Sequence, residues 1–97
     1  MHIDMRKIGE KLDSRPAGRE AFLAMQPNFR EIQKNDRLIL DFTDIALLTP
    51  SFADEFITPL VEEYGERLML KGIQANASVR ETLAFLAEGW PQKPVMQ

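Results

Sequence analysis

The chain has 97 residues, 44% of them hydrophobic and 28% charged, which suits one globular domain with one core and argues against disorder. The net charge is −3 and the Lys and Arg residues are scattered among the acids, which argues against a nucleic-acid-binding surface, since that needs clustered positive charge. No apolar stretch approaches the roughly 20 residues that cross a bilayer, the N-terminus has no signal-peptide core, and the lack of Cys excludes disulfides and thiolate metal sites, so we expect a cytoplasmic protein.

The first third of the chain predicts a strand and then a helix. Residues 2–8 alternate polar and apolar side chains, as a short edge strand does, and the alternative of a helix is weakened by Gly9. From residue 16 to residue 25 the apolar positions have helical spacing. Pro27 predicts that this helix ends close to it, which leaves Phe29 in a polar connection.

The middle of the chain carries the most informative pattern, a buried strand that leads through a turn with two hydroxyls into a helix. The unbroken apolar run at residues 38–40 predicts a central strand, over residues 38–42, that is covered on both faces. Two helix starts are open. Thr49 can cap a helix with Pro50 at the first position, or Ser51 can cap it with Asp54 at the third position.

The last part of the chain predicts a divided helix, a strand and a final helix. Pro59 lacks an N–H and crowds the preceding turn, so we expect a kink or break there. Residues 68–77 predict a third strand. Residues 78–81, Ser-Val-Arg-Glu, form a capping box that opens a helix, and Gly89 helps to end it. Residues 91–97 are expected to fray.

The predicted order of elements is therefore β-α-β-α-β-α. Strands joined by helices of this length make right-handed crossovers, so the pattern predicts a compact α/β fold with a small, mostly parallel sheet. The predicted core contains the apolar residues of these faces: Phe22, Leu38, Leu40, Phe52, Phe56, Ile73, Leu83 and Leu86.

The turn before the second helix is the candidate regulatory site. A helix start carries unpaired N–H groups and positive partial charge, which favour a phosphate on the hydroxyl of Ser51 or Thr49. The structural alternative is that these residues only cap the helix, and the two roles are compatible. Arg15, beside another helix start, could contact an anion or could be an ion-paired surface residue.

Four acidic residues give an alternative chemistry. Asp41, Asp44, Asp54 and Glu55 could converge near the carboxyl end of the central strand and bind Mg²⁺ or accept a phosphoryl group. Acids in a first helical turn are stabilising by themselves, which explains Asp54 and Glu55 equally well. Because no pattern assembles a nucleophile, a base and an oxyanion hole, we expect no catalysis and no cofactor.

The segment Leu40–Phe56 resembles the STAS-like family of unknown function. The similarity lies in a strand that ends in an acidic residue, a short corner, and then Ser51-Phe52 with Glu55 behind it. Residues 3–8 and the stretch Gly18–Phe22 are also similar to this family.

The resemblance implies a non-enzymatic signalling module. STAS domains proper include the anti-sigma factor antagonists, which bind a histidine-kinase-like (GHKL) ATPase and are switched by phosphorylation of a Ser at this helix start. By position, the phosphorylated Ser of those domains corresponds to Pro50 in this chain, and Ser51 is the next residue. The resemblance therefore implies a protein partner that contacts the start of the helix through Pro50, Phe52, Asp54 and Glu55. The alternative from the residues themselves is a small Mg²⁺-dependent enzyme or phosphoacceptor.

Overall fold

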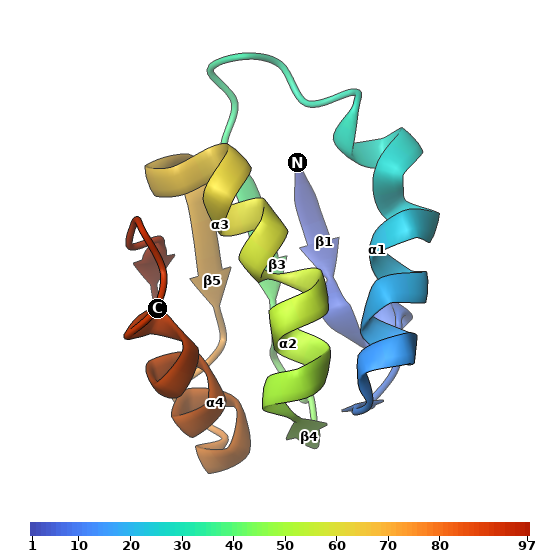
Figure 1. Cartoon of the computed structure of the whole chain (residues 1–97), viewed down its shortest axis with the longest axis vertical. Coiled ribbons are helices and arrows are strands. Elements are labelled where there is room, and N and C mark those ends of the chain that lie inside the picture. The colour runs from blue at the N-terminus through green and yellow to red at the C-terminus, as the bar shows by residue number, and fades with distance from the viewer.

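The computed structural model describes residues 1–97 and has the predicted α/β architecture, with helices packed on a parallel sheet (Figure 1). Four strands form the sheet in the order β1-β3-β5-β6, and β2 pairs with β4 in a separate ladder; all of these pairs are parallel. The strands are β1 His2–Asp4, β2 Lys11–Leu12, β3 Leu38–Asp41, β4 Leu47–Leu48, β5 Leu68–Lys71 and β6 Val95–Met96. The helices are α1 Arg15–Phe29, α2 Pro50–Phe56, α3 Thr58–Tyr64 and α4 Ala77–Ala87, with short 3₁₀ turns at Met5–Lys7 and Gly65–Arg67. None of these helices is both long enough and apolar enough to cross a membrane.

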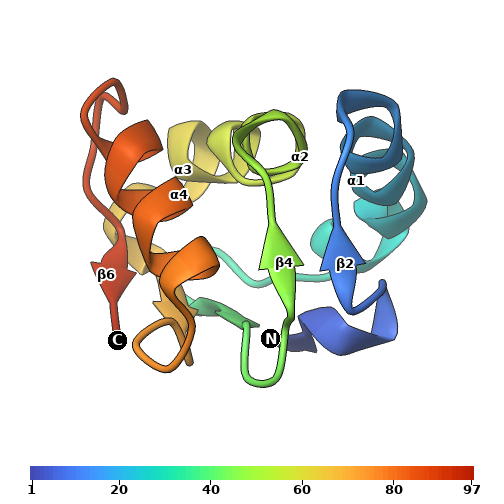
Figure 2. The ribbon, with the colours of Figure 1, turned by 90° about the horizontal axis from the view of Figure 1, so that it is seen from below.

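All helices lie on one side of the four-stranded sheet. Its strands are neighbours in their order along the chain, and right-handed crossovers between successive parallel strands place each connecting helix on the same face. Figures 1 and 2 show α1, α2, α3 and α4 in one layer over the strands. The opposite face of the sheet is left without a helical cover.

The two faces differ in burial although residues 38–40 and 68–70 of the two central strands are all apolar. Leu38 and Leu40 of β3 are fully buried, as are Leu68 and Leu70 of β5 in register with them. The alternate residue Ile39 points to the other face and is only partly buried. The prediction of a strand covered on both faces is therefore wrong, because an apolar residue at every position conceals the alternation.

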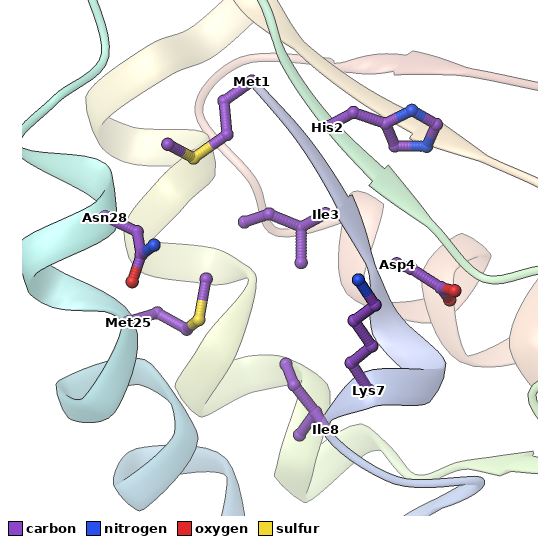
Figure 3. Close-up of a pocket in the computed structure, with 8 residues that line it drawn as sticks. All are labelled: Met1, His2, Ile3, Asp4, Lys7, Ile8, Met25 and Asn28. Carbon is purple, nitrogen blue, oxygen red and sulfur yellow. The ribbon is translucent and has the colours of Figure 1, made fainter.

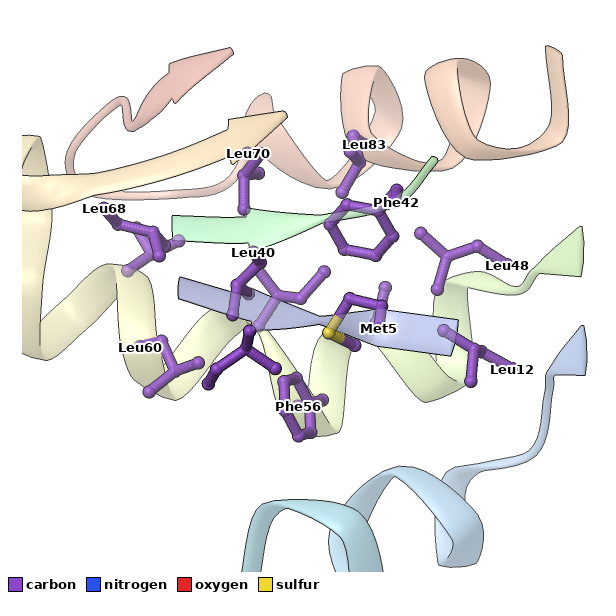
Figure 4. Close-up of a cluster of buried hydrophobic side chains, with 14 of the residues drawn as sticks. Met5, Leu12, Leu40, Phe42, Leu48, Phe56, Leu60, Leu68, Leu70 and Leu83 are labelled. Carbon is purple, nitrogen blue, oxygen red and sulfur yellow. The ribbon is translucent and has the colours of Figure 1, made fainter. Parts of the chain in front are cut away.

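The core lies between the sheet and the helices. Figure 4 shows Leu40 and Leu70 from the strands meeting side chains from the helices, including Phe56, Leu60 and Leu83. Six of the eight predicted core residues are buried: Leu38, Leu40, Phe52, Phe56, Ile73 and Leu83. The other two, Phe22 and Leu86, are partly buried and pack against this cluster.

Helix α1 is longer than predicted. It continues through Pro27, which is exposed. Only two residues of the helix follow this proline, so the N–H that it lacks removes a hydrogen bond only in the last turn. Phe29 is consequently in the helix and buried, where its ring lies 6.3 Å from that of Phe56. The predicted polar connection at Phe29 is wrong.

Four predictions near the strands and the last helix also need correction. The first strand ends at Asp4, and β5 ends before Gly72, which has a φ of 74°. Asn76, and not Ser78, caps α4, since its side chain accepts from the N–H of Val79. Residues 91–97 are not frayed, because they contain β6, which pairs with β5.

Candidate functional site

The start of α2 is the corner that the sequence singles out, and Thr49 is its cap. The hydroxyl of Thr49 accepts a hydrogen bond from the N–H of Phe52 at 3.3 Å, and Pro50 takes the first helical position. This confirms the first of the two predicted helix starts and excludes Ser51 as the cap. The backbone N–H of Thr49 also donates to the carbonyl of Leu12 at 3.0 Å, which ties the corner to β2.

A second set of hydrogen bonds holds the corner from the side of α4. The hydroxyl of Ser78 accepts from the N–H of Leu48 at 3.2 Å and donates to the carbonyl of the same residue at 3.3 Å. Thr82, which is buried, donates to that carbonyl at 2.7 Å. The residue before the cap is therefore held by two hydroxyls of α4, and the corner is attached on both sides.

Ser51 differs from its neighbours because its hydroxyl makes no hydrogen bond within the chain and its side chain is partly exposed. Pro50 beside it is exposed, and Asp54, one turn later on the same helix, is partly exposed. The corner thus combines a firmly held backbone with one free hydroxyl in its first turn.

Phe52 does not belong to this surface. It is 2% exposed and stacks on Phe56, with the ring centroids 5.9 Å apart. Its backbone is equally enclosed, since a Cβ added to Gly18 of α1 would lie 2.6 Å from the carbonyl oxygen of Phe52. The assignment of Phe52 as a core residue is confirmed, and its assignment as a partner contact is wrong.

Asp54 and Glu55 are tied to other elements. Arg15 at the start of α1 forms an ion pair with Asp54 at 3.2 Å and approaches Glu55 at 3.8 Å. Asp54 also accepts from the hydroxyl of Thr58 at 2.9 Å, and that hydroxyl in turn accepts from the indole N–H of Trp90. The guanidinium of Arg15 faces two carboxylates, so of the two predicted roles for Arg15 the structure favours the ion-paired surface residue over the anion contact.

The other two predicted acids lie elsewhere. Asp41, at the end of β3, accepts hydrogen bonds from the hydroxyl and the N–H of Thr43 at 2.6 and 2.9 Å, and lies 3.4 Å from His2. The hydroxyl of Thr43 is the main reason why the pKa of Asp41 is lowered from its ordinary value. Asp44 instead faces Arg6 at 3.7 Å.

The four carboxylates therefore do not converge. Asp54 and Glu55 share Arg15, whereas Asp41 and Asp44 have separate partners. No group of three or more His, Cys, Asp or Glu side chains lies close enough together to hold a metal ion. The geometry gives the predicted magnesium or phosphoacceptor cluster no support.

Two hollows lie along α1 on the side of the N-terminal segment. The first, of about 360 Å³, opens between β1 and α1, and Figure 3 shows Ile3, Ile8 and Met25 beside it. The second, of about 380 Å³, lies between α1 and β2, and Phe52 is its only lining residue from α2. The first hollow also has His2, Asp4 and Lys7 in its lining, but no hydrogen bond or ion pair joins these three side chains to one another.

One comparison with known proteins places the chain in a family. The sequence profile of the STAS-like domain of unknown function (DUF4325) matches residues 28–77, which include β3, the corner, α2, α3 and β5. The chain belongs to this family. No curated protein and no solved structure matched the chain.

The match covers the corner that the sequence had singled out, but several residues that build it were not predicted. Ser78 and Thr82 are too far from Leu48 in the sequence for a local pattern to connect them. The only sequence signal for Gly18 was a glycine inside a helical pattern, which often marks a close approach of two backbones.

Proposed function

We propose that this STAS-like domain is a non-enzymatic interaction module that binds a partner protein through the start of α2. The surface consists of Thr49, Pro50, Ser51 and Asp54, which are exposed or partly exposed; we call it the α2 corner. By the resemblance to anti-sigma factor antagonists, the partner is a histidine-kinase-like ATPase.

The observation that supports this proposal is the firmly held corner with a free hydroxyl. Hydrogen bonds from β2 and α4 hold the backbone at Leu48 and Thr49, so little conformational entropy is lost when a partner binds there. Ser51 makes no internal hydrogen bond, so a phosphate could be added to it without loss of a cap.

Phosphorylation of Ser51 would change the charge of the corner strongly. A phosphate carries about −1.5 to −2 charges at neutral pH, and here it would lie one turn from Asp54. Repulsion and desolvation should then weaken binding to an acidic or apolar partner surface. The position of Ser51 in the first helical turn partly compensates this charge within the domain itself.

The proposal can be tested with an ATPase encoded next to this protein. Titration calorimetry should detect binding of the wild-type domain, and incubation with ATP should add one phosphate, which mass spectrometry of the digest should locate at Ser51 or, as the second choice, Thr49. Ser51→Asp should weaken binding in part, since an aspartate supplies less charge and fewer acceptor oxygens than a phosphate.

Gln33→Asp is a matched control for this charge. Gln33 is exposed in the connection between α1 and β3, which lies at the opposite end of the molecule from the α2 corner (Figure 1). Binding that is equally weakened by both substitutions would show that the effect is one of net charge, and binding unaffected by Ser51→Asp would refute the α2 corner as the docking surface.

A further inference from the structure

The uncovered face of the four-stranded sheet is unusual for a parallel sheet, because such sheets are normally covered on both faces. One row across this face is apolar on three of the four strands: Ile39, Met69 and Val95 are neighbours in register on β3, β5 and β6, and His2 of β1 ends the row. The three apolar residues are partly buried, and none of them belongs to the hydrophobic core or packs against it. We call this row and the strand residues around it the open face.

A charged row lies two residues further along the same strands. The row consists of Asp4 on β1, Asp41 on β3 and Lys71 on β5, which are neighbours in register, so their side chains point to the same face as Ile39 and Met69. The side chain of Asp41 is 19% exposed, and Lys71 is exposed. Lys71 makes no hydrogen bond or ion pair through its side chain within the chain, and its charge acts on Asp41 of the same chain only at longer range, as a minor cause of the lowered pKa of that carboxyl.

We infer that the open face binds a second copy of this chain, with a two-fold axis that runs parallel to the strands between β3 and β5. This axis places β3 of one copy over β5 of the other at the same height along the strands. Ile39 then lies over the partner's Met69, and Asp41 lies over the partner's Lys71. Because the axis is two-fold, each contact occurs twice.

Charge complementarity is the first reason to choose a second copy as the occupant. The proposed axis lies midway between β3 and β5, so it places Asp41 of each copy over Lys71 of the other. Opposite charges therefore meet at both positions. The strand order supports the same axis, since two strands lie on each side of it. The apolar row of one copy would meet that of the other, with the sheets aligned about 10 Å apart.

The size of the open side is the second reason. The molecule measures 32 × 24 × 22 Å along its principal axes, and the view of Figure 1, down the shortest axis, looks through the helices onto the sheet. The open face therefore lies on the broadest side of the molecule, 32 by 24 Å. A stable interface buries roughly 800 Å² on each partner, so most of this side, and not the strands alone, would take part in the contact.

The dimer is independent of the α2 corner. Helix α2 lies in the helical layer, on the side of the sheet opposite to the open face (Figure 2). A dimer formed through the sheet would therefore leave both α2 corners accessible to partner proteins.

Analytical ultracentrifugation of the 97-residue chain tests the inference, at concentrations from about 1 μM to about 1 mM. The wild type should sediment as a dimer with twice the chain mass of 11.1 kDa at the upper end of this range. Met69→Lys, which places a charge in the apolar row, should be monomeric throughout. Lys71→Glu should weaken the association by roughly tenfold or more, because it sets an acid against Asp41 at both sites.

Phe85→Lys is the matched control, since Phe85 is an exposed apolar residue, 64% exposed, on helix α4. It should leave the association unchanged. A wild type that stays monomeric at all concentrations would overturn the inference, and so would a dimer that Phe85→Lys dissociates but Met69→Lys and Lys71→Glu do not. If circular dichroism shows that Met69→Lys is unfolded, Lys71→Glu decides the matter, and its circular dichroism must match that of the wild type, because the new acid also lies beside Asp41 of its own chain.

The orientation of the two copies can be tested by cross-linking, because the natural chain has no Cys. One preparation carries Ile39→Cys and another carries Met69→Cys, and a short bismaleimide is added to their mixture. The proposed axis predicts mixed cross-linked dimers in preference to either pure product. A pure Ile39→Cys product alone would instead require β3 to lie over β3 and would overturn the proposed axis.

Discussion

The two faces of the sheet show how a nearly uniform apolar sequence can serve two different environments. On the helical side, Leu40 is fully buried under α2 and α3 and belongs to one continuous core. On the open face, its sequence neighbour Ile39 is only partly buried and outside that core. Substitutions that remove the same number of atoms on the two sides should therefore have unequal effects.

The largest effect is expected at the aromatic cluster under the helices. Phe56 is fully buried, and its ring has the rings of Phe22, Phe29 and Phe52 as neighbours at 5.9–6.4 Å between centroids. Phe56→Ala should lower the free energy of unfolding by about 3–5 kcal/mol, a large part of the stability of a small domain. Urea denaturation measures this loss. Phe85→Ala, at an exposed phenylalanine, should change stability by no more than about 0.5 kcal/mol.

The comparison of the two faces is most direct at adjacent residues of β3. Leu40→Ala should cost about 2–5 kcal/mol, because it leaves a cavity in the core. Ile39→Ala should cost about 1 kcal/mol, because its side chain is already partly in water. Both variants are compared with the wild type in urea at a low protein concentration, at which association does not contribute. Equal losses would contradict the assignment of Ile39 to an uncovered face.

The close crossing of α1 and α2 belongs to the covered side alone. Helix propensity predicts that Gly18→Ala stabilises α1 by about 1 kcal/mol. The new Cβ would, however, lie 2.6 Å from the carbonyl oxygen of Phe52, so the two helices must separate, at a cost of about 1–3 kcal/mol. We expect a net destabilisation in thermal unfolding. Gly89→Ala is the control, since its Cβ would meet nothing closer than 3.8 Å.

Local chemistry made part of this fold predictable. Thr49 followed by Pro50 predicts the cap and first residue of α2, and Pro59 predicts the break that separates α2 from α3; the structure has both. These features depend on a few successive residues, so no tertiary contact was needed to predict them.

Features that depend on distant contacts could not be predicted in the same way. Ser78 has the sequence of a helix cap, but its hydroxyl bonds the backbone of Leu48, and Asn76 caps the helix instead. Strand β6 is stabilised by its pairing with β5, which no pattern in residues 91–97 indicates. At the α2 corner, the sequence identified Ser51 correctly as part of the helix start. It gave Phe52 both a core role and a surface role, and only the burial of Phe52 in the structure decides between the two roles.

The smallest expected effect concerns the carboxylate at the end of the open face. Hydrogen bonds from Thr43 lower the pKa of Asp41 below its ordinary value of 3.8, so the folded protein favours the charged form more than the unfolded chain does. The resulting stabilisation is fully present above about pH 4 and is lost as the pH falls through the lower pKa of the folded state. Asp41→Asn has no such charge to lose. Urea denaturation should therefore show a difference in unfolding free energy between wild type and Asp41→Asn that is greatest near neutral pH and narrows below pH 3.8. The other carboxyl groups are shared by both proteins, so their titration largely cancels in this difference. A difference that stays constant down to the acid limit of folding would mean that the Thr43 hydrogen bonds do not favour the charged form of Asp41.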